Sequence, residues 1–309
     1  MIIMKKKLAG VLPIVHVPFE VDGTIDQKIL KKEIDWIFSV KAHGLGTGMV
    51  SEILRLTFDE RIALTNHIVE FTDGRGSTFA GVGAESTKQA LVYAKAAEKA
   101  GCDGIMAIPP VTTSLPEEAV LSHFRTLAEE VNVPLIVQDA SGYVGQAIPI
   151  RIYIQLLELY GNEKILFKPE ASPIGPNLSA LRDASSGKAK IFEGSGGILL
   201  VDSFRRGITG TMPGVDLLDG VVALWNALIN GDEKSIYRIY FPICAIVALQ
   251  LQAGLDGFLA IEKFILKHRN IFKNEMRRVP YSWDLDHETS SEIKRLLHVL
   301  DQALSLGQS

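Results

Sequence analysis

The feature that most constrains the fold of this 309-residue chain is an eightfold alternation of short apolar runs with stretches of helical periodicity. The runs are continuously apolar, which is typical of parallel strands buried on both faces. They lie at 11–17, 44–48, 78–82, 104–107, 135–138, 165–168, 191–193 and 208–212. The helical stretches lie at 26–41, 58–72, 86–100, 117–130, 150–160, 175–185, 197–206 and 216–230. Eight strands that are each followed by a helix predict a TIM barrel, with a doubly wound open sheet as the alternative.

Local signals mark the ends of several predicted helices. Thr57 precedes Phe58-Asp59-Glu60, which predicts a capping box at the start of the second helix. Pro116 followed by two glutamates indicates another first turn, and Gly101 suits a left-handed C-terminal cap.

The last quarter of the chain predicts three further helices, at 233–253, 257–271 and 287–305. No stretch rich in Gly, Ser or Pro separates them from the barrel, so we expect a single structural unit. Its predicted parts are a TIM barrel over 1–231 and a helical extension over 232–309 that packs on the barrel.

Charge and hydropathy exclude several classes of partner. The 32 Lys and Arg against 36 Asp and Glu give a net charge of −4, which offers no field for nucleic acid or an anionic membrane. The longest uncharged run, 239–255, contains Pro242 and Gln250 and is too short and polar for a bilayer span. It indicates a buried or subunit-facing helix, and we expect a cytoplasmic chain.

In a TIM barrel, the candidate active-site residues follow the carboxyl ends of the strands. They are Ser51, Glu52, Gln138, Asp139, Lys168, Glu170 and the turn 193–197. His16, near the end of the first predicted strand, is a further candidate.

Lys168 gives the sharpest hypothesis, because it ends the buried run Ile165-Leu166-Phe167. Burial favours the neutral form of an amine, and a neutral amine at a barrel mouth is what Schiff-base chemistry on a carbonyl requires. The alternative is a structural lysine that reaches solvent or pairs with Glu170.

The other motifs are less specific. The turn Glu193-Gly194-Ser195-Gly196-Gly197 exposes N–H groups that favour an anion, although glycines also simply make tight turns. None of the seven histidines has zinc-site spacing, and no G-x-S-x-G elbow of a serine hydrolase occurs.

Several of these segments resemble motifs of one known family. They are the opening 10–23, Gly48-Met49-Val50-Ser51-Glu52, Ala80-Gly81-Val82-Gly83, the stretch 97–103 and Phe167-Lys168-Pro169-Glu170-Ala171. Together they resemble the dihydrodipicolinate synthase and N-acetylneuraminate lyase family of class I aldolases, over about residues 10–305. The resemblance implies a TIM barrel with Lys168 as the Schiff-base lysine.

The chain departs from that family at informative positions. Gln138 stands where the family has its proton-relay tyrosine, and Tyr143 stands where it has an arginine. Met49 and Val50 replace two threonines, and Val111 falls within the family's P-Y-Y position. An amide cannot cycle a proton as a phenol does, so we do not expect synthesis of dihydrodipicolinate.

A nearer resemblance is to the family's 2-keto-3-deoxy sugar acid dehydratases. The matching segments are Ser51-Glu52, Met106-Ala107-Ile108-Pro109-Pro110, Val137-Gln138-Asp139-Ala140 and Glu193-Gly194. This likeness implies a C–O lyase that acts on a small 2-keto acid.

The predicted site follows from these matches. Lys168 forms the imine, Gln138 orients substrate or water, and Glu193 or a bound water transfers the proton. The substrate-binding residues are Met49, Val50, Ser51, Gly194 and Ser195, with the substrate carboxylate on the N–H groups around Val50 and Ser51. We expect no metal and no organic cofactor.

Three alternatives stay open. One is a retro-aldolase or hydratase-aldolase, another is a dihydrodipicolinate-synthase-like enzyme that uses pyruvate, and the third is a non-catalytic relative that binds a metabolite. The resemblance also implies a homo-oligomer, either a dimer or a tetramer. It further implies that the chain binds a small 2-keto acid as its substrate.

Overall fold

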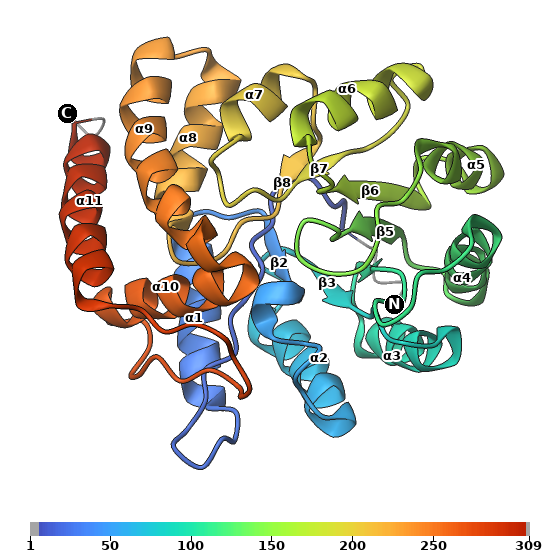
Figure 1. Ribbon diagram of the computed structural model, residues 1–309, viewed down its shortest axis with the longest axis horizontal. Coiled ribbons are helices and arrows are strands. Elements are labelled where there is room, and N and C mark those ends of the chain that lie inside the picture. Colours follow the sequence, from blue (N-terminus) through green and yellow to red (C-terminus); the bar gives the residue numbers. More distant parts are fainter. Residues whose placement is uncertain (1–5, 307–309) are drawn as a thin grey trace.

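The computed structural model describes residues 6–306 and shows a parallel (β/α)8 barrel with a helical extension (Figure 1). The strands are β1 (Gly10–Val11), β2 (Gly44–Gly46), β3 (Ser77–Gly81), β4 (Gly104–Ala107), β5 (Leu135–Asp139), β6 (Ile165–Pro169), β7 (Phe192–Glu193) and β8 (Gly210–Thr211). The barrel helices are α1 (Gln27–Ser39), α2 (Phe58–Thr72), α3 (Thr87–Ala100), α4 (Glu117–Glu130), α5 (Ile150–Tyr160), α6 (Ile174–Ala184), α7 (Leu200–Arg205) and α8 (Leu218–Asn230). The predicted barrel is therefore confirmed.

The strands form two parallel sheets that isolated bridges join into a ring. One sheet has the order β2-β3-β4-β5-β6, and the other has the order β1-β8-β7. Parallel bridges from Ile14 to Gly46 and from Phe167 to Ile191 connect the two. An open doubly wound sheet is thereby excluded, because both edges are paired.

The shortest strands, β1, β7 and β8, lie in the second sheet, and each is shorter than the apolar run that predicted it. The run at 11–17 forms only the two-residue β1, because Pro13 has no N–H to donate to a ladder. Likewise α7 begins at Leu200 and not at 197, because Gly196 and Gly197 adopt positive φ values of 71° and 107°. The capping box at Thr57 is present, with its side chain accepting from Glu60 N–H.

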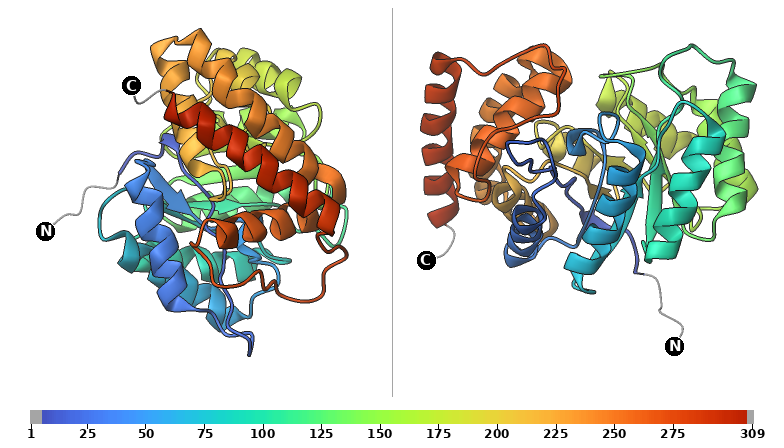
Figure 2. Two further views of the ribbon diagram at one scale, coloured as in Figure 1. Left: turned by 90° about the vertical axis from the view of Figure 1, so that its left-hand side faces the viewer. Right: turned by 90° about the horizontal axis from the view of Figure 1, so that it is seen from below.

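The extension consists of α9 (Glu233–Gln250), a short 3-10 turn η2 (Leu251–Ala253), α10 (Gly254–His268) and α11 (His287–Ser305). It packs beside α8, with α11 outermost against α9 (Figure 2). The predicted bounds 1–231 and 232–309 agree with where α8 ends and α9 begins, although residues 1–5 and 307–309 lie outside the described residues. The division into barrel and extension stays a prediction.

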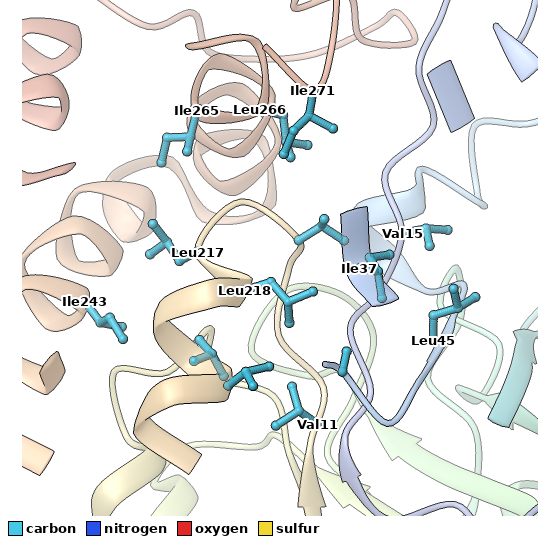
Figure 3. Packing of buried hydrophobic residues seen from close by; sticks show 14 of the residues in the cluster. Val11, Val15, Ile37, Leu45, Leu217, Leu218, Ile243, Ile265, Leu266 and Ile271 are labelled. Atoms are coloured by element: carbon cyan, nitrogen blue, oxygen red, sulfur yellow. The ribbon is translucent and has the colours of Figure 1, made fainter. Parts of the chain in front are cut away.

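One large apolar cluster joins the extension to the barrel. Its fully buried members include side chains of α1, α8, α9, α10 and α11, among them Ile37, Leu218, Ile243 and Ile265, and of the strands β1 and β2 (Figure 3). By length and composition, the helical stretch Glu233–His268 would be able to cross a membrane, yet half of its most apolar window is buried in the molecule, and core helices pass the same test.

A second cluster forms between the β3–β6 strands and α3–α6. A third occupies the barrel, with side chains drawn from successive strands: Leu8, Leu12, Ile14, Phe79, Met106, Ile136, Leu166, Phe192 and Met212. The strand ends therefore stand on a packed floor, as TIM barrels require.

Candidate active site

A cavity lies where the carboxyl ends of the strands meet the extension. Together with its opening to solvent, it comprises about 440 Å³ of space free of protein atoms. The lining residues are Ile14, Met49, Val50, Gln138, Tyr143, Lys168, Glu170, Gly194, Gly196, Met212, Pro213, Gly214, Leu255, Phe258 and Glu262. They come from β5 and β6, from the segments that follow β1, β2, β5, β6, β7 and β8, and from α10.

The polar centre of this cavity is a cluster of three side chains on neighbouring strands. Gln138 and Lys168 are register partners on β5 and β6, so their side chains leave the sheet side by side. Lys168 Nζ lies 3.3 Å from Glu170 Oε2, and the Gln138 amide donates to the same oxygen at 2.6 Å. All three residues are buried.

The electrostatics of the cluster centre on Glu170. Burial raises the pKa of its carboxyl, although the contacts with Lys168 and with the Gln138 amide both oppose this rise. A carboxyl with a raised pKa beside an amine is suited to take up a proton and return it.

Gly194 leaves room for this cluster. A Cβ at position 194 would overlap both the Glu170 carboxylate and Lys168 Cε. Three of the predicted substrate-binding residues line the cavity, namely Gly194, Met49 and Val50.

Ser51 lies outside the cavity lining, because its hydroxyl has another partner. Its Oγ donates to Val15 O at 2.5 Å and accepts from Gly48 N–H at 3.1 Å, and the residue is fully buried. These bonds hold the 3-10 turn η1 (Met49–Ser51) in place. Ser51 thus shapes the turn that presents Met49 and Val50.

Glu193 and Ser195 lie behind the cavity wall. Glu193 Oε1 accepts from Ser195 N–H at 2.5 Å, and Oε2 accepts from the Thr211 hydroxyl at 2.7 Å. Ser195 Oγ caps Leu199 N–H at 2.9 Å. Both carboxylate oxygens are engaged in fixing the turn after β7, so the geometry favours Glu170 over Glu193 for proton transfer.

Two other strand-end candidates have structural partners. Asp139 accepts from Ser141 N–H at 2.9 Å and from Ile148 N–H at 2.7 Å, which fixes the loop that carries Tyr143. Glu52 pairs with Lys263 of α10 at 2.5 Å.

Sequence reasoning missed the residues that the extension and the β5 loop contribute. Leu255, Phe258 and Glu262 of α10 line the cavity, and the Tyr143 ring packs edge-on against Phe258. Burial, with Glu170 and Glu262 nearby, raises the pKa of the Tyr143 phenol, which therefore stays protonated near neutrality. The only signal available was the polar face of an otherwise apolar helix.

A buried ion-pair network lies against the cavity at Glu262. His16 Nε2 lies 2.8 Å from Glu262 Oε2, and His16 Nδ1 lies 3.3 Å from Glu33 Oε1. Burial alone lowers the pKa of His16, but the two carboxylates outweigh it and raise that pKa to about 10. His16 is therefore an imidazolium near neutral pH. Within residues 6–306, no group of three His, Cys, Asp or Glu side chains is arranged to hold a metal ion.

The fold and the cavity define a TIM-barrel protein with its candidate active site at the strand ends, centred on a buried lysine. Residues 7–211 match the model of the Dihydrodipicolinate synthetase family, and the chain belongs to that family.

Curated relatives carry the name 4-hydroxy-tetrahydrodipicolinate synthase. The protein of Persephonella marina is 34% identical over 178 residues, which are 57% of this chain and 55% of the relative. That of Methanococcus maripaludis strain C6 is 31% identical over 57% of this chain and 61% of the relative. These alignments thus span little more than half of each relative's length.

Solved structures confirm the fold. The 4-hydroxy-tetrahydrodipicolinate synthase of Methylacidiphilum fumariolicum SolV superposes with a TM-score of 0.86 at 22% identity, covering 97% of this chain and 98% of that one. A chloride-inhibited dihydrodipicolinate synthase from Acinetobacter baumannii, complexed with pyruvate, gives a TM-score of 0.84 at 21% identity, covering 95% and 98%.

Proposed function

We propose that this protein is a Schiff-base-forming lyase that acts on a small 2-keto acid. The observation that carries the proposal is the pairing of Lys168 Nζ with Glu170 Oε2 at 3.3 Å inside the strand-end cavity. Lys168 is the sole cationic side chain among the described residues that line it. An amine and a buried carboxyl in contact supply the nucleophile and the proton carrier that imine chemistry needs.

The reaction begins with imine formation. Lys168 Nζ attacks C2 of the substrate, the carbonyl oxygen leaves as water, and an iminium forms. Glu170 then takes a proton from C3, the C–H electron pair becomes the C2–C3 double bond of an enamine, and the C=N pair returns to nitrogen.

The finer proposal is a dehydratase of 2-keto-3-deoxy sugar acids. The enamine expels the C4 hydroxyl, which takes a proton and leaves as water, so a C3–C4 double bond forms and the iminium is restored. Water then hydrolyses the iminium and frees Lys168. Gln138 supports this proposal, because its amide donates to Glu170 where a relay phenol would otherwise stand.

The names of the relatives favour a second candidate, an aldolase-type reaction that uses or releases pyruvate. In the retro-aldol direction, the C4 hydroxyl gives its proton to Glu170 and C4 becomes the carbonyl carbon of the released aldehyde. The C3–C4 bond breaks, and its electron pair forms the C2–C3 double bond of the enamine. The absence of a cation other than Lys168 among the described lining residues disfavours an aldehyde that carries a carboxylate. Product analysis separates the two, since an aldolase releases pyruvate and a dehydratase does not.

The test is borohydride reduction in the presence of pyruvate or a panel of 2-keto-3-deoxy sugar acids, read by peptide mass spectrometry. We expect a reduced adduct on Lys168 and none in Lys168→Ala. Lys263 is a built-in control, because it is equally buried but is paired with Glu52 outside the cavity lining. The absence of any adduct, with keto-acid binding unchanged in Lys168→Ala, would overturn the proposal in favour of a metabolite-binding protein.

The assembly is also a proposal. We expect a homo-oligomer, and on α9 the rings of Tyr237 and Phe241 lie 5.6 Å apart at an angle of 33°, with Phe241 63% exposed. Light scattering at several protein concentrations measures the mass directly, and a monomer at all of them would contradict this expectation.

A further inference from the structure

The cavity contains a second carboxylate that the imine chemistry does not use. Glu262 lies on α10, outside the barrel strands, yet it lines the same cavity as Lys168 and Glu170. Glu262 is only 2% exposed, so its carboxylate needs hydrogen-bond donors or a cation within the protein.

One oxygen of Glu262 is fixed by the protein. His16 Nε2 lies 2.8 Å from Oε2, and the His16 ring is held in turn by Glu33 at its Nδ1 and backbone N–H. The second oxygen, Oε1, lies against Gly214, where a Cβ would overlap it. Because Gly214 also lines the cavity, the missing side chain leaves Oε1 next to the space that a substrate would fill.

The charge of this region is defined by its neighbours. A pKa of about 10 makes His16 a cation near neutrality, and it contacts the carboxylates of Glu33 and Glu262. Asp216 is also near Gly214, and burial together with Glu262 raises its pKa to about 7. Two of the lining residues, Glu170 and Glu262, thus carry carboxyl groups, while the lining lysine is consumed by the imine.

We propose that Glu262, oriented by His16, accepts hydrogen bonds from hydroxyl groups of the substrate beyond C3 and thereby selects 2-keto acids with a hydroxylated, uncharged tail. This inference rests on the proposed function and names its specificity determinant. His16 is a positioning residue, because it acts through Glu262.

Two physical arguments support this selection. A buried acceptor loses water on substrate binding, so an analogue without the hydroxyl leaves it unpaired and is rejected. A substrate with a second carboxylate would meet Glu262, whose contacting cation, His16, is already shared with Glu33, and like charges in a buried site repel. Tyr143 and Phe258 pack beside this region and offer apolar surface to the carbon chain.

The test compares adduct formation with three acids: pyruvate, 2-keto-3-deoxypentonate and 2-oxopentanoate, which has the same chain length without the hydroxyls. In the wild-type protein we expect the hydroxylated acid to be trapped about 10- to 100-fold more efficiently than 2-oxopentanoate. In Glu262→Gln we expect that ratio to fall at least tenfold, and pyruvate, which has no hydroxyl for Glu262 to bind, is the reference acid for each variant.

Glu33→Gln is the matched control variant. Glu33 is equally buried and contacts the same histidine, but it is not among the cavity-lining residues described. The amide oxygen that replaces Oε1 can still accept from the His16 ring and backbone N–H, so we expect this variant to change stability, to leave His16 in place and to keep the ratio between the two five-carbon acids.

Three outcomes would overturn the inference. One is equal trapping of both five-carbon acids by the wild-type protein, a result that needs no variant to fold. Another is a loss of adduct formation in Glu262→Gln that is equal for all three acids and that Glu33→Gln reproduces. This result would show that Glu262 has only a structural role. Failure of the wild-type protein to trap any acid is distinguishable from both, because it overturns the proposed function as well.

Discussion

The two halves of the barrel are built differently. The sheet β2–β6 is regular, with five-residue strands β3, β5 and β6, while β1, β7 and β8 have two residues each. The regular half carries Gln138 and Lys168 in register, and the short-stranded half is covered by α8 and the extension (Figures 1 and 2).

The difference shows how the candidate site divides its tasks. Ladder hydrogen bonds fix the reacting lysine and its neighbour, since register decides which side chains lie together. The second carboxylate, Glu262, instead depends on tertiary packing between α10 and the segment that follows β1, through His16. The regular half therefore supplies the chemistry, and the packed half supplies contacts that select the substrate.

The largest expected effect lies in the regular half. Glu170→Gln should lower turnover by about 10²- to 10⁴-fold, because it removes the carboxyl that carries the C3 proton. Borohydride trapping should persist, because the amine remains. Steady-state kinetics beside adduct yield measure the two effects separately.

Glu193→Gln is the informative partner of that variant, since Glu193 was the residue predicted from sequence for proton transfer. Its oxygens are bonded to Ser195 N–H and the Thr211 hydroxyl. If Glu193→Gln lost turnover while Glu170→Gln kept it, the assignment of the two carboxyls would be reversed.

The next largest effect concerns how the extension is held to the barrel. Lys263 is fully buried and donates to Glu52 at 2.5 Å, Val17 O at 2.9 Å and Met276 O at 2.7 Å. Lys263→Met leaves Glu52 buried without its cation and should cost about 3–5 kcal/mol of unfolding free energy. Denaturant titration measures this cost.

An ion pair of the regular half serves as the control. Lys95 and Glu130 join α3 and α4 on the exposed surface at 2.7 Å. Lys95→Ala should leave the unfolding midpoint unchanged, because water solvates both charges in either state. Equal losses of unfolding free energy in Lys263→Met and Lys95→Ala would refute the distinction between a buried ion pair in the packed half and an exposed one in the regular half.

The regular half is also the part that sequence predicts best. The bounds predicted for α2, α4 and α5 are the observed ones, because helix-start signals and apolar periodicity agree there, and in the extension the same holds for α11. The strands β1, β7 and β8 are shorter than predicted, because proline and glycine interrupt the ladder without interrupting the apolar pattern.

The same contrast holds for the site. Lys168, Gln138 and Gly194 were predicted at the strand ends, Met49 and Val50 were predicted from the family resemblance, and all five line the cavity. Glu262 was not predicted, because nothing local in the sequence says that an α10 carboxylate meets the end of the first strand. Such a contact arises from long-range packing, which a periodic pattern does not encode.

A smaller effect is expected at Gly194. In Gly194→Ala the new methyl group would displace the Lys168 side chain or the Glu170 carboxylate, so we expect adduct formation to slow by about 10- to 100-fold. Gly142→Ala is the matched control in a neighbouring loop, where the nearest atom would lie 3.4 Å from the added Cβ. Equal rates in the two variants would show that the cluster tolerates a displacement.

The smallest effect is a pH dependence of stability that belongs to the packed half. The folded-state pKa of His16 is about 10 against 6.5 for the free side chain, because Glu262 and Glu33 outweigh the cost of burial. A raised pKa means that the folded state holds the proton longer than the unfolded state does. The contribution of His16 is therefore complete below about pH 6.5 and is lost as the pH rises towards 10.

The window from pH 7.5 to 8.5 isolates this group. Asp216, whose pKa is about 7, has the same sign but loses most of its contribution below that window. One proton changes the unfolding free energy by at most about 1.4 kcal/mol per pH unit, so the wild-type protein should lose up to this amount between the two pH values. His16→Gln should have a flatter slope over the same interval, measured by urea titration at each pH. Equal slopes of unfolding free energy against pH in the wild type and in His16→Gln would mean that His16 is neutral in the folded protein. The hypothesis that an imidazolium orients Glu262 would then be wrong.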